Sequence, residues 1–380
     1  MKEKEKEKKA KLLFFASDYK IGLSTLLTQE LIAFKNAGIN LTCVAGENEQ
    51  EYGLSEQLRK QDIDIIRIQG LDNHANFKFL SKQITSIIKE NAISHVHVQN
   101  NWQLLMVTYC KYAKFVPERF SIIYTLHGFR NNHVVKSYLA VIIIGFFLFL
   151  FANKIIVMSE YVKKKFFFLS YKIKKLYLGV DSSFFEKREN EIPTDIIRMV
   201  FPAQFRLGKN QDLLIDAVER YKKQNPESPI ELYLPGTGEF LNDSIQLVKN
   251  KKLEDVVFFP GQCTKDEIRK LYEQCNIGVV SSNSETFGQS IVEPFVLGRC
   301  VITRKVGVAI DIIKDGESGF FYDTSEELTA ILQEISKDIN IVKRIGNSNF
   351  LNRGMFSWQN IASIYTSDIL CVENLDYILS

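Results

Sequence analysis

Residues 199–234, MVFPAQFRLGKNQDLLIDAVERYKKQNPESPIELYL, show the alternation on which the fold class depends. An apolar run at 199–203 leads through a loop containing Gly208 into an amphipathic segment at 212–221, and a second apolar run follows at 231–234. Short apolar runs that alternate with helix-length amphipathic segments are typical of βαβ units, in which the strands are parallel. This stretch therefore predicts a parallel sheet flanked by helices.

The same alternation continues in both directions along the chain. On the N-terminal side we expect strands at 12–16, 41–45, 63–68, 95–99, 122–126, 155–158 and 175–178. On the C-terminal side we expect further strands at 256–259, 277–280, 301–303 and 320–322. The two series predict an α/β protein with two doubly wound, Rossmann-like domains. Ligands of such sheets bind at the carboxyl ends of the strands, so we expect the two domains to face a central cleft.

A length of 380 residues suits two domains, and a polar, charged segment that ends in Pro193 separates the two series of strands. The predicted division is a charged tail at 1–10, a first domain at 11–186, a linker at 187–194 and a second domain at 195–357. Residues 358–380 extend beyond what the second sheet needs. They form a candidate C-terminal helix that packs back on the first domain.

The overall composition excludes several classes of protein. With 46% hydrophobic and 24% charged residues, the chain has the composition of a packed globular protein rather than a disordered one. Lys plus Arg (48) nearly balance Asp plus Glu (45), so nucleic acid is not an expected partner. The six cysteines are scattered without zinc-ligand spacing, which predicts neither a disulfide scaffold nor a metal and fits a reducing, cytoplasmic location.

The longest apolar run, 139–152, has 14 residues. As a helix it would measure about 21 Å, too short for the roughly 30 Å core of a bilayer. The following residues, 154–177, contain seven lysines and one acid, Glu160. An apolar face beside a cationic one is typical of anchoring at an anionic membrane surface, so 139–177 predicts peripheral association with the inner face of the cell membrane. A buried helix with a solvated lysine face is the alternative.

The strongest candidate site is the sequence SETFGQSIVE at 284–293, after the strand 277–280. Gly288 allows close approach of the backbone to a ligand, and it opens a helix whose N-terminus suits a phosphate or diphosphate. Glu285 and Glu293 flank that anion site and can accept hydrogen bonds from sugar hydroxyls. Taken alone, the segment also fits an ordinary helix start.

Two other loops of the second domain add candidates. Arg206 and Lys209 lie in a glycine-containing loop after the strand 199–203, where cations would neutralise a diphosphate leaving group; a solvated loop is the alternative. Gly236 and Gly238 follow the strand 231–234, and such a pair is equally typical of a plain turn.

In the first domain, His127 ends a strand, where it can bind a sugar hydroxyl or phosphate or make a structural hydrogen bond. Asp18 and Gly22 follow the first strand and Asn101 follows the fourth, so these three are candidates to border the expected cleft. His95 and His97 share one face of a strand, but no third ligand is near in the sequence, which favours a core or cleft-lining role over a metal site.

The sequence resembles the retaining nucleotide-sugar glycosyltransferases of the GT-B fold, in particular glycosyltransferase family 4. The resemblance covers nearly the whole chain and is denser in its second half. It depends on E-T-F-G-x-x-x-x-E at 285–293, Arg206 and Lys209, G-x-G at 236–238, F-P-G at 259–261, L-G-V-D at 178–181, H-G at 127–128 and F-S-W at 356–358. The chain departs from the family in four places. Ala203-Gln204 replace a common Gly-Arg, Leu178 replaces the Asn that often precedes Gly-Val-Asp, Ile21-Gly22 replace a glycine pair, and Pro294 replaces a common Ala. A proline there predicts that the helix has barely begun.

The resemblance implies roles for the candidates. Glu293 would bind the ribose hydroxyls of a nucleotide diphosphate sugar and Glu285 the transferred sugar. The backbone at Phe287 and Gly288, with Arg206 and Lys209, would hold the diphosphate. His127 would lie near the reacting centre, and Asp18, Gly22 and Asn101 would be acceptor-side candidates. Neither a metal nor another cofactor is expected.

The function predicted in this way is retaining transfer of a hexose-type sugar to a lipid-linked or oligosaccharide acceptor, during synthesis of a surface polysaccharide such as capsule, O-antigen or exopolysaccharide. Two alternatives stay open. One is a nucleotide-sugar epimerase or hydrolase on the same scaffold, and the other is a non-catalytic, nucleotide-sugar-binding assembly subunit.

Overall fold

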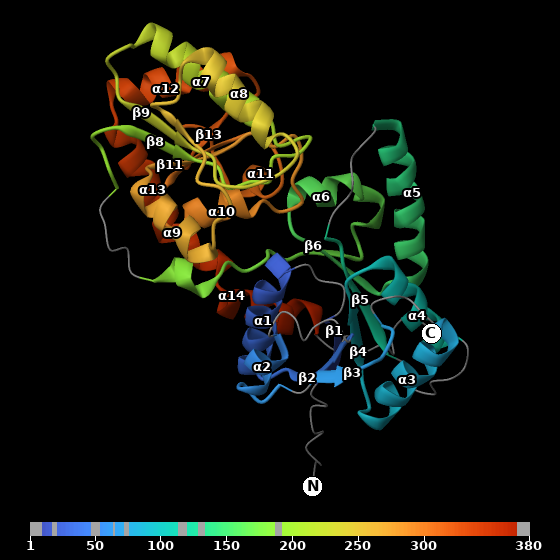
Figure 1. Cartoon of the computed structure of the whole chain (residues 1–380). Helices are drawn as coiled ribbons and strands as arrows, with labels where there is room; N and C mark the ends of the chain where they lie inside the picture. Colours follow the sequence, from blue (N-terminus) through green and yellow to red (C-terminus); the bar gives the residue numbers. More distant parts are fainter. Residues whose placement is uncertain are drawn as a thin grey trace. The chain divides into compact units, whose positions relative to one another are not determined.

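The structure, a computed structural model, describes residues 10–16, 21–46, 54–63, 65–71, 76–112, 120–127, 134–186 and 192–370. The chain divides into two compact units. The first unit comprises Met1–Met158, Lys163–Asp181 and Trp358–Ser380, and the second comprises Ser159–Val162 and Ser182–Ser357. Each unit has one parallel sheet with its own core (Figure 1).

The first unit contains a seven-stranded sheet in the order β3-β2-β1-β4-β5-β6-β7. Every pairing between neighbouring strands is parallel. The strands are β1 (Lys11–Phe15), β2 (Asn40–Ala45), β3 (Ile65–Arg67), β4 (His95–Val98), β5 (Ser121–Thr125), β6 (Lys154–Val157) and β7 (Ile173–Lys175). Leu12, Leu13, Phe14 and Phe15 of β1 are all fully buried, as expected for a central strand that is covered on both faces.

Helices connect these strands and cover the sheet. They are α1 (Ile21–Asn36), α2 (Leu54–Arg59), α3 (Phe77–Glu90), α4 (Asn101–Tyr112), α5 (Val134–Phe151) and α6 (Glu160–Lys165), followed by a 3-10 helix, Phe167–Leu169. The apolar run predicted at 139–152 thus lies in α5 and its end. Among the described residues, no helix combines the length and the hydropathy needed to cross a bilayer.

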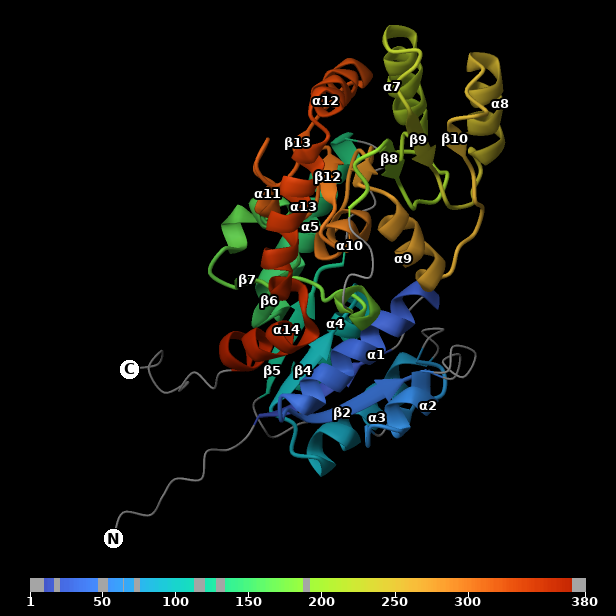
Figure 2. The same cartoon turned by 90° about the vertical axis from the view of Figure 1, so that its left-hand side faces the viewer.

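The C-terminal segment belongs to the first unit. Helix α14 (Trp358–Ile364) and the π-helix Tyr365–Ile369 pack beside α1 (Figure 2), and Trp358, Ile361 and Tyr365 are buried in the same core as Phe14 and Phe34. The indole Nε1 of Trp358 donates to Gln29 Oε1 at 3.0 Å. Gln29 in turn donates to Asp181 Oδ2 at 2.9 Å, so the C-terminal segment is tied to the end of the L-G-V-D sequence.

The glycine of that sequence has a steric reason. A Cβ on Gly179 would overlap with the indole ring of Trp358, 2.5 Å from its Cε2 atom. The two sequence motifs L-G-V-D and F-S-W therefore meet in the first unit as a packing contact, in which only glycine leaves room for the indole.

The second unit contains a six-stranded parallel sheet in the order β10-β9-β8-β11-β12-β13. Its strands are β8 (Ile197–Val200), β9 (Ile230–Tyr233), β10 (Val257–Phe258), β11 (Ile277–Val280), β12 (Cys300–Thr303) and β13 (Phe320–Phe321). Its helices are α7 (Gln211–Gln224), α8 (Leu241–Lys251), α9 (Lys265–Gln274), α10 (Gln289–Val296), α11 (Ala309–Ile312), α12 (Ser325–Lys337) and α13 (Asn340–Asn352), with 3-10 helices at Ser182–Phe185 and Arg353–Phe356. The strand order reverses between β8 and β11, and ligands of doubly wound sheets bind beside such a reversal.

Both sheets confirm the predicted α/β class with two doubly wound domains. One detail differs from the sequence predictions. The last strand of the first sheet is Ile173–Lys175 rather than 175–178, and Leu176 continues from it by donating its N–H to Val157 O at 3.0 Å. The second unit resumes at Ser182, and Phe184 is buried in it against Tyr272. Most of the predicted linker at 187–194 and the tail 1–9 lie outside the described residues.

Candidate functional site

The candidate site lies in the second unit, where two loops leave the carboxyl ends of β8 and β11. The first loop carries Lys209 and the second carries Glu285, and their side chains form an ion pair with Lys209 Nζ 2.5 Å from Glu285 Oε1. The side chains are only 12% and 17% exposed. Residues 76 positions apart in the sequence are thus joined at the edge where the topology predicts a ligand.

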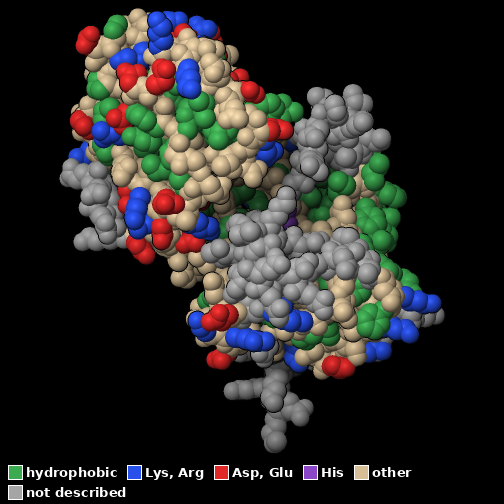
Figure 3. All heavy atoms as spheres, viewed as in Figure 1, with side chains coloured by type: hydrophobic (Ala, Val, Ile, Leu, Met, Phe, Trp, Pro, Cys, Tyr) green, Lys and Arg blue, Asp and Glu red, His purple; other side chains and the backbone are tan. Residues whose placement is uncertain are grey.

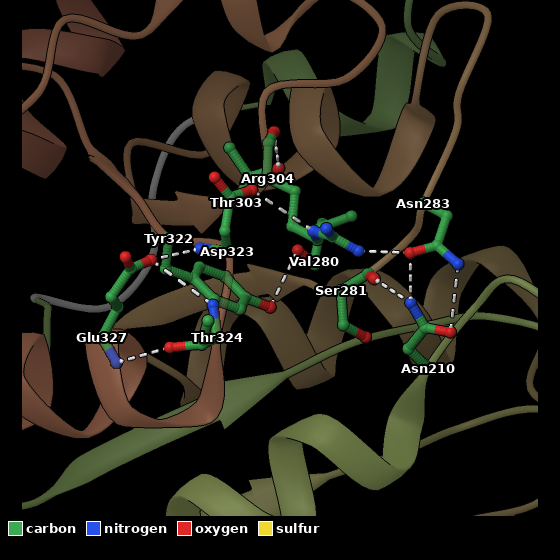
Figure 4. Close-up of polar contacts among 10 residues, drawn as sticks. All are labelled: Asn210, Val280, Ser281, Asn283, Thr303, Arg304, Tyr322, Asp323, Thr324 and Glu327. Atoms are coloured by element: carbon green, nitrogen blue, oxygen red, sulfur yellow. Dashed lines mark hydrogen bonds and ion pairs between the residues drawn. The ribbon is translucent and has the colours of Figure 1, made fainter.

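The backbones of these two loops are also tied together (Figure 4). Ser281 Oγ donates to the carbonyl oxygen of Lys209 at 2.6 Å, and the N–H of Asn283 donates to Gly208 O at 2.8 Å. Asn210 donates through Nδ2 to Ser281 O at 3.2 Å and to Asn283 Oδ1 at 2.6 Å. Because both ends of the contact are held, the position of Lys209 does not depend on its ion pair alone.

A second cation joins this network from the end of β12. The guanidinium of Arg304 donates to Asn283 Oδ1 and lies 3.7 Å from Asp323 Oδ1 (Figure 4). The sequence patterns did not single out Arg304, Asn210 or Asn283. The available signal was their position, because Asn283 and Arg304 closely follow strands and Asn210 directly precedes α7.

Helix α10 begins beside Glu285. Gly288 precedes its first residue in the left-handed conformation, with φ 95°, which glycine adopts without strain. The preceding residue, Phe287, is buried against Phe356, and its carbonyl oxygen accepts the N–H of Val308 at 2.8 Å. A Cβ on Gly307 would overlap with that same carbonyl. The start of α10 is therefore held in place beside Glu285, whose Cβ would lie 3.6 Å from a Cβ on Gly288.

Pro294 lies in the interior of α10, not at its start as the sequence predicted. Proline leaves the carbonyl of the residue four positions earlier without its helical donor. That carbonyl, of Ser290, accepts the Tyr272 hydroxyl at 3.5 Å. A Cβ at Gly278 would overlap with the Pro294 ring, so glycine in β11 gives the ring its space. The helix accommodates the proline through these two neighbours.

Glu293 is half-buried in α10, one residue before this proline. Burial, and then the negative charge of Glu293, raise the pKa of Tyr272 well above its usual range. Glu293 is therefore close to the buried Tyr272 hydroxyl. It lies in α10, the helix that begins directly after Gly288.

Gly236 and Gly238 bring a third loop, after β9, against the loop after β8. A Cβ on Gly236 would overlap with Ala203 O, and one on Gly238 would overlap with Phe205 O. The N–H of Gly236 donates to Gly261 O at 2.7 Å, so the F-P-G sequence supports the same turn. Arg206 is exposed beside this contact. The structure thus gives both glycines a packing role and brings neither Arg206 nor the glycines into the Lys209–Glu285 contact.

In the first unit, His127 belongs to a buried network. Its Nε2 is hydrogen-bonded to Gln99 Oε1, and burial lowers the pKa of His127 to about 4. His97 lies deeper, with Nε2 2.6 Å from Thr125 Oγ1 and Nδ1 2.9 Å from the Tyr365 hydroxyl. Burial, and then His127, lower the pKa of His97 to about 3. Both imidazoles are therefore neutral at pH 7.

His97 and its neighbour His95 are both buried, as the core prediction for these two residues stated. In the described part of the chain, no three His, Cys, Asp or Glu side chains are grouped as metal ligands.

The acceptor-side candidates are less closely grouped. Asn101 begins α4, and its Oδ1 accepts the Tyr124 hydroxyl at 2.8 Å. Gly22 was expected in a loop but lies within α1, because the helix begins at Ile21. Asp18 lies outside the described residues. The structure therefore brings together Lys209, Glu285, Phe287 and Gly288 but does not assemble an acceptor site.

Comparisons with known proteins cover both units. Residues 182–350 match the family model of the Glycosyl transferases group 1. The O-antigen biosynthesis glycosyltransferase WclY of Escherichia coli is 28% identical over 279 residues, which are 68% of this chain and 76% of WclY. The phosphatidylinositol N-acetylglucosaminyltransferase gpi3 subunit of Schizosaccharomyces pombe is 25% identical over 196 residues, which are 50% of this chain and 42% of that protein. The chain spans less than half the length of several such curated relatives.

Solved structures share the arrangement of both sheets. The crystal structure of Anabaena Alr3699/HepE in complex with UDP has a TM-score of 0.76 at 19% identity, and the alignment covers 94% of this chain and 99% of that one. Two doubly wound sheets, the match to that fold and the family match over the second unit lead to one conclusion. The chain has the GT-B fold of glycosyltransferase structures, and residues 182–350 match the Glycosyl transferases group 1 family.

Proposed function

We propose that the chain transfers a hexose-type sugar, with retention of configuration, from a nucleotide diphosphate sugar to an acceptor in the synthesis of a surface polysaccharide. The observation that carries this proposal is the Lys209–Glu285 ion pair beside Gly288, inside the matched domain. A cation and a free helix N-terminus suit the diphosphate, and a carboxylate suits the hydroxyls of the sugar attached to it.

Donor binding exchanges the partners of this pair. Lys209 turns from the Glu285 carboxylate to a phosphate oxygen, and Glu285 becomes free to accept hydrogen bonds from the transferred sugar. Arg206 adds a second cation to the diphosphate, and Glu293 binds the ribose, as in family 4. Since the pair is nearly buried, the donor replaces one desolvated charge contact with another and does not leave either charge alone.

The reaction then depends on positioning and electrostatics. The acceptor hydroxyl attacks the anomeric carbon from the face that the diphosphate leaves, and its proton passes to the leaving phosphate oxygen. Lys209 and the N–H groups at the start of α10 stabilise the negative charge of the diphosphate as it departs. In this scheme His127 contacts the reacting sugar as a neutral imidazole, and no metal ion takes part.

Relatives suggest the substrates to test first. Alr3699/HepE has been solved with UDP and with UDP-glucose, and WclY is named for O-antigen biosynthesis. We therefore propose a UDP-sugar donor and a lipid-linked or oligosaccharide acceptor. A lipid-linked acceptor requires the chain to work at the inner surface of the cell membrane.

Thermal unfolding with UDP, GDP, ADP and CMP at millimolar concentration tests the donor site. A ligand at about 100 times its dissociation constant adds roughly 2.7 kcal/mol of stability. We expect stabilisation by one nucleoside diphosphate, reduced in Glu293→Ala and Lys209→Ala but unchanged in Lys314→Ala, whose ion pair with Glu317 is exposed. Equal stabilisation of the unchanged chain and of all three variants would refute the assignment of the site.

Product analysis separates the alternatives. Release of free or epimerised sugar from UDP-sugar in the absence of any acceptor would favour the hydrolase or epimerase. Nucleotide binding with no turnover on any acceptor would favour the non-catalytic subunit, for which the Ala203-Gln204 departure is the sequence argument.

A further inference from the structure

Helix α5 exposes a row of large apolar side chains. Ile142, Ile143, Phe146, Phe149 and Leu150 recur with helical spacing, and each is between 45% and 62% exposed. The opposite side of the helix is buried, with Gly145 and Leu148 facing the first unit. A helix that is apolar on all sides is normally buried in a core or in lipid, so the exposed row of α5 lacks the cover that its composition implies.

The segment after α6 extends the same surface. Phe168 packs on α5, where a Cβ on Gly145 would lie 2.5 Å from the end of its ring, while Phe167 is 75% exposed and Tyr171 is 65% exposed. Figure 3 shows hydrophobic side chains gathered along the part of α5 that leads to its C-terminus. We call these residues, with the row on α5, the apolar face.

Lysines accompany the apolar face. Lys172 Nζ donates to the carbonyl oxygens of Phe149 and Ala152 at 2.6 and 2.8 Å, and it also lies over the Phe149 ring. This lysine therefore fixes the Tyr171 segment to the end of α5. Lys164 and Lys174 are exposed on the same stretch of chain. Residues 161–180 contain six lysines and no acidic residue.

The charge pattern identifies the occupant. A second copy of this chain would place like charges against each other, because its apolar face would bring the same lysines. An anionic bilayer provides an apolar interior for the phenylalanine and isoleucine side chains and negative headgroups for the lysines around them.

We propose that the apolar face is the surface by which the chain docks on an anionic membrane, with α5 lying in the plane of the headgroups. This deepens the proposed function, because it supplies the surface on which a lipid-linked acceptor would be met. The proposed docking surface is narrower than the range 139–177 predicted from sequence, because it consists of the exposed side of α5 with Phe167, Phe168 and Tyr171.

Vesicle flotation of the full chain tests the proposal, with vesicles of phosphatidylcholine alone or with about one third phosphatidylglycerol. We expect binding to the anionic vesicles only. Phe146→Gln and Phe167→Gln should each lower the binding constant roughly tenfold, because each removes a large apolar group from the lipid. Lys164→Gln and Lys174→Gln should each lower it about fivefold at low salt, as expected for one basic residue near the surface.

Leu351→Gln is the matched control, since Leu351 is 84% exposed in the second unit, and it should bind like the unchanged chain. Absence of binding to anionic vesicles, or binding that survives all four substitutions, would overturn the proposal. A dimer that dissociates in Phe146→Gln would also overturn it, in favour of a contact between copies. Stabilisation by UDP is measured on the same variants, so a failed membrane surface is distinguishable from a failed donor site.

Discussion

The two units share one architecture but differ in where their polar side chains lie. All five histidines and both tryptophans belong to the first unit, in which His95 and His97 are in the core and α5 turns an apolar row outward. The second unit has neither residue type. Its Lys209, Glu285 and Arg304 are at the carboxyl ends of strands. Among the described residues, the Lys209–Glu285 ion pair, which joins two loops after strands, is therefore a feature of the second unit.

This difference offers a practical way to study each unit separately. Trp102 and Trp358 are both in the first unit, so tryptophan fluorescence follows that unit alone. Stabilisation by nucleotide follows the second unit, where the proposed donor site lies. Variants of either unit can thus be scored with two independent signals.

The largest effect is expected from the contact that ties the C-terminal segment into the first unit. Trp358→Ala should destabilise that unit by about 3–5 kcal/mol, because a buried indole and its hydrogen bond to Gln29 are lost. This loss of stability is measured by denaturant unfolding that is monitored through Trp102 fluorescence.

Gly179→Ala should also destabilise the first unit, since its Cβ meets the indole ring. In Trp358→Ala the ring is gone, so the same Gly179→Ala change should cost much less there. Gly354→Ala is the control, because nothing lies within 4 Å of a Cβ at that position. Strict additivity of the Gly179 and Trp358 changes would contradict the contact.

The next effect is on activity and concerns the second unit. Lys209→Ala should lower kcat/KM by about 10²–10³-fold, the loss typical of removing one group that stabilises developing negative charge. The unfolding of the first unit, monitored by tryptophan fluorescence, should not change in this variant. Lys314→Ala, from an exposed pair at 3.9 Å, should keep full activity. Equal activity of the two variants would show that the pair with Glu285 is structural.

Acid should weaken the first unit more than the second. The pKa of His97 is about 3 in the folded chain and about 6.5 when unfolded. Between these values the unfolded chain binds a proton that the folded chain does not, so stability falls as pH falls. The contribution is up to about 1.4 kcal/mol per pH unit.

Denaturant midpoints by tryptophan fluorescence between pH 7 and pH 5 measure this slope. His97→Gln should make it shallower, while the stabilisation by nucleotide, from a unit without histidine, should keep its pH dependence. An unchanged slope in His97→Gln would contradict a neutral, buried His97.

The smallest effect concerns the tie between the two loops of the second unit. Ser281→Ala removes the hydrogen bond to Lys209 O and should cost about 1 kcal/mol. We expect the KM for the donor to rise about fivefold, with kcat nearly constant. Ser336→Ala, whose hydroxyl donates to Gln333 O on an exposed helix, is the control. A lower kcat at constant KM would contradict a positioning role.

Much of this could be predicted from sequence because the signals are local. Thirteen strands were predicted from short apolar runs, and most match the structure closely, since a buried parallel strand has to be apolar along its whole length. Lys209 and Glu285 were predicted because each lies in a glycine-containing loop that follows an apolar run. Pro294 was misjudged because its place in the helix depends on a distant partner: Tyr272 donates to Ser290 O, the carbonyl that the proline leaves without a helical donor.

Sequence periodicity was enough to establish two doubly wound sheets and the loops in which a diphosphate site belongs, because these follow from the spacing of apolar and glycine residues along the chain. Three features required the folded structure: the pairing of Lys209 with Glu285, the network of His97 with Tyr365, and the outward face of α5. Each depends on which side chains from distant segments meet, or fail to meet. Periodicity does not contain that information, because it specifies which face of a helix or strand is apolar but not what packs against it.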